Sequence, residues 1–108
     1  MVLTGKALED FLRWAKRRLN MRLYEIDQME MWFNFQEDIF KNALIIEWFD
    51  SVGIYIDIVI VFKKDTPKYV YYYGRYTNQS QQYNTRQEAT KHAIIKANKI
   101  YNEQQQGK

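Results

Sequence analysis

The segment ALIIEWFDSVGIYIDIVIVFK, residues 43–63, places two apolar stretches on either side of DSVG. In the second stretch every even-numbered residue from Ile54 to Phe62 is apolar, which is the two-residue period of a β-strand. Residues 43–50 and 54–63 are therefore expected to be neighbouring strands. DSVG between them is predicted to be a hairpin loop, a type I turn followed by Gly53 in the left-handed conformation.

This predicted loop sets the register of the hairpin. Trp48 would face Ile56, so that apolar residues meet across the two strands. On the other face, Glu47 would lie opposite Asp57. If the DTP segment forms the next loop, Arg75 also falls opposite Asp57. The row Glu47, Asp57 and Arg75 is predicted to be a cross-strand ion network that fixes the register, in preference to a catalytic carboxylate pair.

Five tyrosines in KYVYYYGRY, residues 68–76, mark the next expected strand, residues 69–77. In the register above, three of its rings point away from the isoleucines and form an aromatic sheet face with residues of the neighbouring strands. That predicted contact face consists of Tyr69, Tyr71, Tyr73, Phe49, Tyr55, Val59 and Val61, with Ile45 beside it. A face this apolar needs a cover, either a helix, a second subunit or a ligand.

The segments that flank these strands predict helices. Thr4 is a suitable N-cap for an amphipathic helix that reaches about Leu19. Thr85 and Glu88 form a capping box that opens a second helix, with alanines every fourth residue on its inner side. Residues 29–35 alternate between apolar and polar and are expected to be a further strand, although a helix also fits. Residues 20–28 are ambiguous.

This element order predicts one α+β domain over residues 1–102, with a helix, a three- to four-stranded antiparallel sheet and a helix. The polar sequence of residues 103–108 predicts a disordered tail. The start of the chain lacks the apolar core of a secretory signal. The run from Ile54 to Phe62 is too short to cross a bilayer as a helix. We therefore expect a cytoplasmic protein without a membrane contact.

The composition speaks against several kinds of chemistry. The chain has no cysteine and one histidine, His92, so a His/Cys metal cluster is excluded. The two serines, Ser51 and Ser80, lie in expected loops, and a phosphate-binding glycine motif is missing. We therefore expect a protein that is not an enzyme and that needs no catalytic residues, metal or cofactor. Charge is segregated: both ends are basic, and residues 23–62 hold eight acidic residues and one basic residue.

Two segments, WFDSVG at residues 48–53 and NTRQEATKHAIIKANKIYN at residues 84–102, resemble short motifs in small hypothetical proteins of gut Bacteroides and their phages. The resemblance implies an α+β domain and carries no known activity. The order of elements is also similar to that of the double-stranded-RNA-binding domain. The lysine cluster of that family is represented here only by Arg86 and Lys91, and DSVG lacks its proline and histidine, so the similarity concerns topology.

The sequence predicts a binding or assembly module that acts through the aromatic sheet face, with an accessory role in a phage or mobile element. A second copy of the chain is the favoured partner, and another protein is the alternative. The runner-up function is weak binding of nucleic acid, with bases stacked on the tyrosines. Its expected basic contacts are Lys63, Lys64, Lys68 and Arg75.

Overall fold

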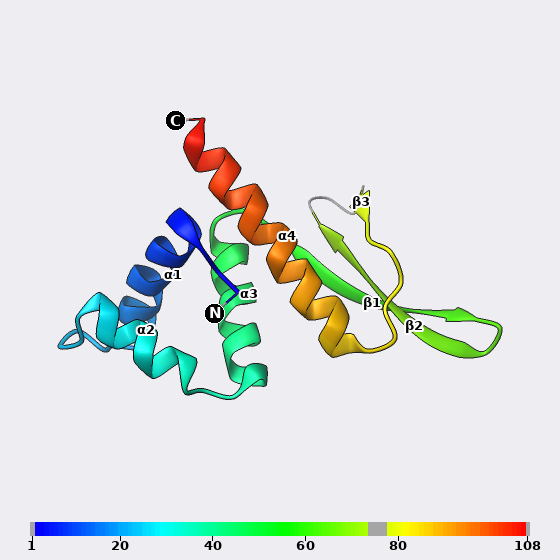
Figure 1. The fold of residues 1–108 in the computed structure, drawn as a ribbon, viewed down its shortest axis with the longest axis horizontal. Coiled ribbons are helices and arrows are strands. Elements are labelled where there is room, and N and C mark those ends of the chain that lie inside the picture. The colour runs from blue at the N-terminus through cyan, green and yellow to red at the C-terminus, as the bar shows by residue number, and fades with distance from the viewer. Residues whose placement is uncertain (1, 74–77, 108) are drawn as a thin grey trace.

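The computed structural model describes residues 2–73 and 78–107; for residue 78 it describes the backbone alone. The described chain has the order α1 (Gly5–Arg18), α2 (Ile26–Asn34), α3 (Asp38–Ser51), β1 (Ile56–Lys63), β2 (Thr66–Tyr73), β3 (Asn78–Gln79) and α4 (Arg86–Gln106). Helices combined with an antiparallel sheet confirm the α+β class. The molecule is elongated, 52 × 33 × 18 Å. Helices α1–α3 occupy one end, the β1–β2 hairpin the other, and α4 spans both (Figure 1).

Residues 43–50, expected to be a strand, belong to helix α3. Four large residues of this segment are buried at helical spacing: Leu44, Ile45, Trp48 and Phe49. The helix ends in a Schellman motif, in which Ile54 N–H donates to the Phe49 carbonyl at 2.9 Å and Gly53 N–H to the Asp50 carbonyl at 3.2 Å. Gly53 has the predicted left-handed conformation, with φ +83°. It terminates a helix, however, and the predicted hairpin loop is wrong.

Residues 29–35, also expected to be a strand, lie in α2 and at its C-terminal cap. Met29 and Phe33, four residues apart, are buried against the other helices. The Gln28 side chain accepts a hydrogen bond of 2.8 Å from the Glu25 amide and so satisfies one free N–H at the start of this helix. The expected order of one helix, three or four strands and one helix is therefore replaced by three helices, a hairpin with a short β3, and a fourth helix.

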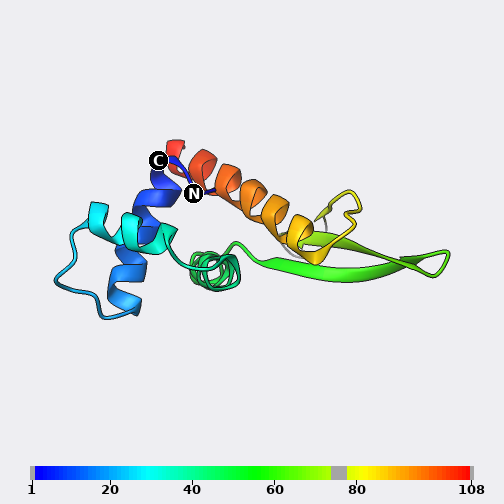
Figure 2. The ribbon, with the colours of Figure 1, turned by 60° about the horizontal axis from the view of Figure 1, so that its bottom comes forward.

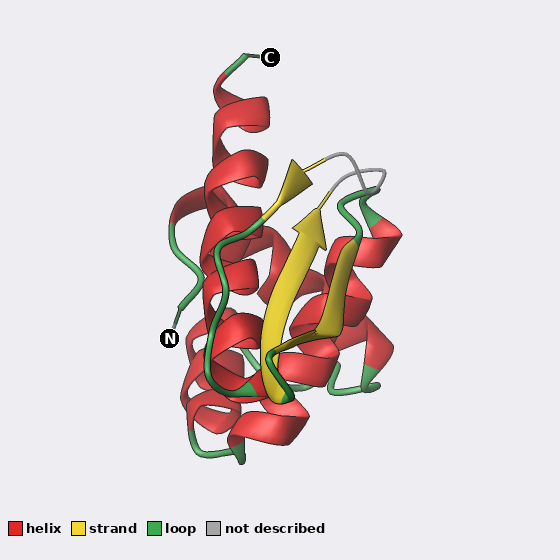
Figure 3. Cartoon of the chain, turned by 90° about the vertical axis from the view of Figure 1, so that its right-hand side faces the viewer, coloured by secondary structure: helices red, strands yellow, loops and turns green. Residues whose placement is uncertain are grey.

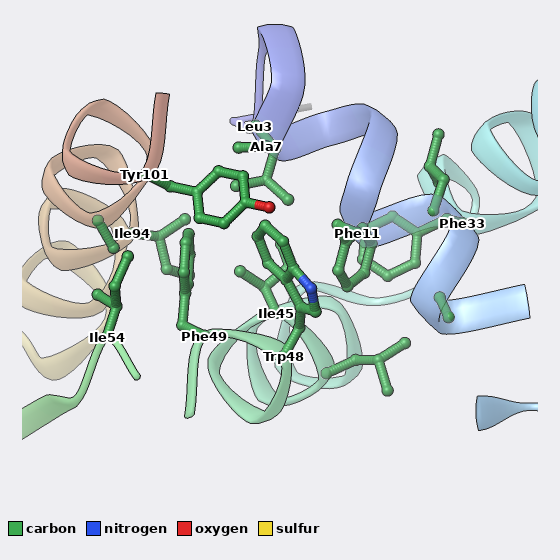
Figure 4. Packing of buried hydrophobic residues seen from close by; sticks show 14 of the residues in the cluster. Leu3, Ala7, Phe11, Phe33, Ile45, Trp48, Phe49, Ile54, Ile94 and Tyr101 are labelled. Atoms are coloured by element: carbon green, nitrogen blue, oxygen red, sulfur yellow. The ribbon is translucent and has the colours of Figure 1, made fainter. Parts of the chain in front are cut away.

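The core of the helical end forms around Trp48 of α3 (Figure 4). Its ring lies 5.8 Å from Phe11 of α1, 4.8 Å from Phe49 and 4.9 Å from Tyr101 of α4, measured between centroids. Both predicted N-cap positions are confirmed: Thr85 caps α4 by accepting a hydrogen bond from the Glu88 N–H, whereas Thr4 precedes α1 without a side-chain capping bond. Since α1 and α4 place apolar side chains around the same indole ring, the two ends of the sequence are joined in one core.

Strands β1 and β2 pair in a register that differs from the predicted one. The loop between them contains only Lys64 and Asp65, with φ of 51° and 65°, as in a type I′ turn. Ile58 faces Tyr71 as a result, and the other isoleucine–tyrosine pairs follow: Ile56 with Tyr73 and Ile60 with Tyr69. Because side chains alternate along a strand, this odd shift of register moves the tyrosines onto the isoleucine face.

Helix α4 covers one face of the hairpin, as Figures 2 and 3 show from two directions. Its Arg86 and Lys96 lie over the rings of Tyr69 and Tyr73, so this is the shared face. Two residues of its predicted alanine stripe, Ala89 and Ala93, are buried here, so that the helix approaches the sheet closely. The helix continues to Gln106, and residues 103–106, for which the composition predicts disorder, are helical. The tip of the hairpin extends beyond the first turn of α4 (Figure 1).

Candidate protein-binding surface

The three tyrosines of the predicted contact face lie between α4 and the hairpin. Tyr71 is only 8% exposed and stacks on Tyr83, which in turn stacks on His92 of α4 at 4.8 Å between centroids. Burial raises the pKa of the Tyr71 hydroxyl. Tyr69 and Tyr73 are half-buried, beneath the cationic side chains of Arg86 and Lys96 respectively. These rings attach α4 to the hairpin, which makes them part of the interior.

The other residues of the predicted contact face are separated from one another. Phe49 lies in the helical core and is fully buried. Tyr55, just before β1, is 54% exposed. Val59 and Val61 are half-buried and point to the sheet face opposite the tyrosines, where Val59 pairs with Val70. Since the register and the strand 43–50 are both wrong, the seven residues do not share one face.

The predicted ion row is wrong for the same reason. Glu47 lies on α3, where its carboxylate accepts a hydrogen bond of 2.8 Å from Arg18 of α1. Asp57 lies on β1 opposite Tyr72. Arg75 is outside the described residues. Because about half of each side chain of the Arg18–Glu47 pair is exposed, the pair contributes little to stability.

Two of the four predicted basic contacts lie at the tip of the hairpin, and a third, Arg75, is outside the described residues. Lys63 and Lys64 are exposed there, next to Phe62, whose side chain is 73% exposed. Lys68, further along β2, donates a hydrogen bond of 2.6 Å to the side-chain oxygen of Asn84. The structure therefore brings two of the four predicted cations together with the exposed ring of Phe62. The sequence-based register had predicted this ring on the core face of the sheet.

A second exposed apolar surface, with more residues than the hairpin tip, lies at the opposite end of the molecule. The sequence did not predict it. Six large apolar residues between positions 23 and 40 are exposed, by 39% to 94% of their surface. We call them the α2 apolar surface: Leu23, Tyr24, Met31, Phe35, Ile39 and Phe40. They come from the segment before α2, from α2 and its C-terminal cap, and from the first turn of α3, where Ile39 lines a separate hollow with Val2 and Lys91.

An open groove of about 490 Å³ runs along part of this surface. It is lined by Leu23, Tyr24, Gln28, Met31, Trp32 and Phe35. Met31 and Phe35 are four residues apart, so that they lie side by side on the outward side of α2. Trp32 forms one wall and meets Phe40 of α3 edge to face at 6.1 Å between centroids. The groove is thus continuous with the exposed first turn of α3.

The charges around the α2 apolar surface are mostly negative, although exposed Arg22 precedes Leu23 and Lys91 lines the hollow beside Ile39. Residues 23–40 contain five carboxylates and no lysine, arginine or histidine: Glu25, Asp27, Glu30, Glu37 and Asp38. Asp27 precedes Met31 by one helical turn and is exposed. The nearest cation that follows, Lys41, lies 3.4 Å from Asp38 and is paired with it. The surface therefore combines an apolar centre with an acidic border.

A sequence signal for this surface exists in α2 itself. Met29 and Phe33 occupy one side of the helix and are buried, whereas Met31 and Phe35 occupy the other side and are exposed. A surface helix of a globular protein normally has a single apolar stripe. Apolar residues on both sides of a short helix indicate a second contact, and the same alternation suggested a strand in the sequence.

Comparison with known proteins gives no relative: no protein-family model matches the chain, and no curated protein or solved structure is significantly similar. Within residues 2–73 and 78–107 there is no cluster of three or more His, Cys, Asp or Glu side chains that could hold a metal ion. The helices of this described part also fall short of the length and apolar character needed to cross a membrane.

Proposed function

We propose that this protein is a non-enzymatic binding module that recognises another protein through the α2 apolar surface. The observation that carries the proposal is the exposure of six large apolar side chains on one short segment, four of them by more than 60%. Four of the six, Leu23, Tyr24, Met31 and Phe35, line one groove, and a contiguous apolar surface of this kind is uncommon on monomers and marks interaction sites. An accessory role in a phage or mobile element rests on the two resembling sequence segments alone.

The composition of the surface supports recognition of protein. Aromatic residues and methionine are enriched in the centres of protein–protein interfaces, and charged residues surround them. Tyr24, Met31, Trp32, Phe35 and Phe40 provide such a centre, and the acidic residues provide the border. Methionine adapts its shape to different partners, because its side chain is unbranched and flexible. The predicted aromatic sheet face is replaced in this role, since α4 covers it.

The proposal is tested by selecting peptides from a random library on the wild-type protein and measuring them on two variants. Phe35→Glu places a charge in the groove, and Phe62→Glu makes the same change at the hairpin tip, where the ring is 73% exposed. We expect selected peptides to bind the wild type and Phe62→Glu equally. Affinity for Phe35→Glu should be lower by a factor of about ten or more, as for a residue at the centre of an interface.

Selected peptides that bind all three proteins equally would contradict the proposal, as would peptides that lose affinity only for Phe62→Glu. Both substituted rings are mostly exposed, so each variant should keep the thermal stability of the wild type within about 0.5 kcal/mol. A thermal denaturation curve of each variant verifies this before the binding measurements.

A second candidate function is weak binding of nucleic acid at the hairpin tip, favoured by the grouping of Lys63 and Lys64 beside exposed Phe62. Such binding would depend on counterion release and fall steeply with salt. Lys63→Glu combined with Lys64→Glu should abolish it, and Phe35→Glu should leave it unchanged. Fluorescence anisotropy of a labelled single-stranded oligonucleotide at two salt concentrations measures both effects. Tight binding that is insensitive to salt would contradict this function.

Helices α2 and α3 are joined by three residues, as in a helix-turn-helix motif. They nevertheless do not support nucleic-acid binding. In DNA-binding proteins the second helix of the motif enters the major groove between phosphates. The exposed residues of α3 include Asp38, Glu47 and Asp50, which are negatively charged. Phosphates would repel this helix, so the helical end of the molecule favours a protein partner.

A further inference from the structure

We propose that the α2 apolar surface receives a basic amphipathic helix of another protein. This inference rests on the proposed function and specifies its partner. The helix would place an apolar stripe in the groove lined by Leu23, Met31, Trp32 and Phe35, and would carry lysine or arginine on the flanks of that stripe. Recognition of this kind, a helix in a groove, uses residues at helical spacing as anchors.

The apolar residues of the surface follow one helix. The groove is open and lies between α2 and the Leu23–Tyr24 segment. Phe35 and Met31 follow each other along α2, and Phe40 extends the same apolar path through its contact with Trp32. An apolar path along one helix matches the stripe that a second helix presents at positions i, i+4 and i+7.

The charges of the surface define the polar flanks of the partner. Residues 23–40 contain five carboxylates and no cation, and the exposed Arg22 just before them leaves the border negative by a wide margin. Of the carboxylates, Glu25, Asp27, Glu37 and Asp38 are exposed and Glu30 is half-buried. Complementary potential between partners speeds their encounter and suppresses wrong partners. A basic helix satisfies this condition, whereas nucleic acid and anionic lipid headgroups carry the same sign as the border and are repelled.

A second copy of this chain is a poor occupant. In a two-fold dimer each residue patch faces its own counterpart, so the two acidic borders would meet. The chain does contain a basic amphipathic helix, α1, but its apolar side is already in the core: Phe11 is 0% and Leu12 3% exposed. On the outward side of α4, Lys91 and Lys99 flank Ile95, which is too small an apolar stripe to fill the groove. The observations therefore favour a different protein.

The test uses three synthetic peptides of equal length. The first has apolar residues at helical spacing with lysine and arginine on the polar side, the second has the same apolar residues with glutamate, and the third is a scrambled form of the first. Two-dimensional ¹H–¹⁵N spectra of the labelled full-length protein show where each peptide binds. The indole N–H of Trp32 reports on the groove, and that of Trp48, which is 2% exposed, reports on the core.

We expect the basic amphipathic peptide to shift the Trp32 signal and leave Trp48 in place. Its affinity should exceed that of the acidic and scrambled peptides by about tenfold or more, because charge complementarity and a continuous apolar stripe are both required. The affinity should fall about tenfold in Phe35→Glu and several-fold in the double variant Asp27→Asn, Glu30→Gln. In Phe62→Glu it should equal that of the wild type.

Equal or tighter binding of the acidic peptide would overturn the inference and leave the proposed function intact. So would library-selected peptides that shift Trp32 when neither designed helix does, because the partner would then not be a helix. Light scattering gives a further outcome: a wild-type dimer that becomes a monomer in Phe35→Glu would identify a second copy as the occupant and refute the basic helix. Failure of the library selection itself would count against the proposed function.

Discussion

The phenol of Tyr101 on α4 donates a hydrogen bond of 2.5 Å to the Asp10 carboxylate on α1. Burial, together with this bond and the nearby negative charge, raises the pKa of Tyr101 to about 12. Burial alone would raise the pKa of Asp10, but the hydrogen bonds from Tyr101 and Lys6 hold it below its usual value of 3.8. The bond connects the first and last helices beside the Trp48 ring.

The Tyr101–Asp10 bond predicts a loss of stability at high pH. A raised pKa in the folded state means that the stabilisation is complete below pH 10 and disappears as the pH rises through about 12. The full difference corresponds to about 2–3 kcal/mol. Urea denaturation of the wild type from about pH 9 to pH 12 should show this decline, and Tyr101→Phe should lack this part of it. If the free energy of unfolding fell with pH equally in the two proteins, the Tyr101–Asp10 bond would not be the source of the decline.

Gly53 should be the most sensitive residue of the α3 terminus. An alanine there would meet no atom within 4 Å, so space is not the obstacle. The obstacle is φ of +83°, which costs a residue with a Cβ atom about 1–2 kcal/mol. Gly53→Ala should lower the free energy of unfolding by that amount.

Gly107→Ala is the matched control for Gly53→Ala. Gly107 follows α4 with φ of −80°, which any residue adopts, and its added Cβ would lie 3.7 Å from the nearest backbone oxygen. Its stability should stay within about 0.5 kcal/mol of the wild type. Equal effects of the two substitutions in urea denaturation would show that the left-handed conformation does not limit stability here.

The Lys64–Asp65 turn should accept a stabilising replacement. Both residues have positive φ, which asparagine and glycine adopt more easily than lysine and aspartate. The double variant Lys64→Asn, Asp65→Gly should therefore gain about 0.5–1 kcal/mol and melt at a higher temperature. The replacement also removes one lysine from the hairpin tip, so nucleic-acid binding there should weaken. An unchanged or lower melting temperature would contradict the type I′ assignment.

How far the sequence predicts this fold depends on whether its local signals agree with the tertiary contacts. Thr4, Thr85 and the alternation from Ile56 onwards identify α1, α4 and β1, because caps and strand periodicity are local properties. Residues 43–50 are different. Leu44, Ile45, Trp48 and Phe49 fit a helix, yet the even-numbered residues Leu44, Ile46 and Trp48 are also apolar at the two-residue spacing of a strand. Local patterns cannot choose between these, whereas packing around Trp48 can.

The predicted aromatic sheet face is wrong for two reasons: residues 43–50 form a helix, and the predicted loop between β1 and β2 has the wrong length. A DTP loop and a two-residue Lys64–Asp65 turn differ by an odd step of register, and such a step exchanges the faces of β2. The turn sequence gives little warning, since neither Lys64 nor Asp65 is the glycine or asparagine that usually marks a type I′ turn. The α2 apolar surface was missed because Met31 and Phe35 were placed in a strand.

Tyr71 provides the last test, because its ring is either a contact for another molecule or a support for α4. Its 8% exposure and its stacking on Tyr83 favour the second role. Tyr71→Ala should lower the free energy of unfolding by about 3 kcal/mol or more, as for other buried aromatic residues. Tyr55→Ala, which removes a ring that is 54% exposed, should cost much less. Tyr71→Glu would bury a carboxylate beneath α4 and should unfold that end of the protein. Light scattering completes the comparison: if the wild type is a dimer and Tyr71→Glu a folded monomer, the tyrosines form an interface after all and α4 must leave the hairpin to expose them.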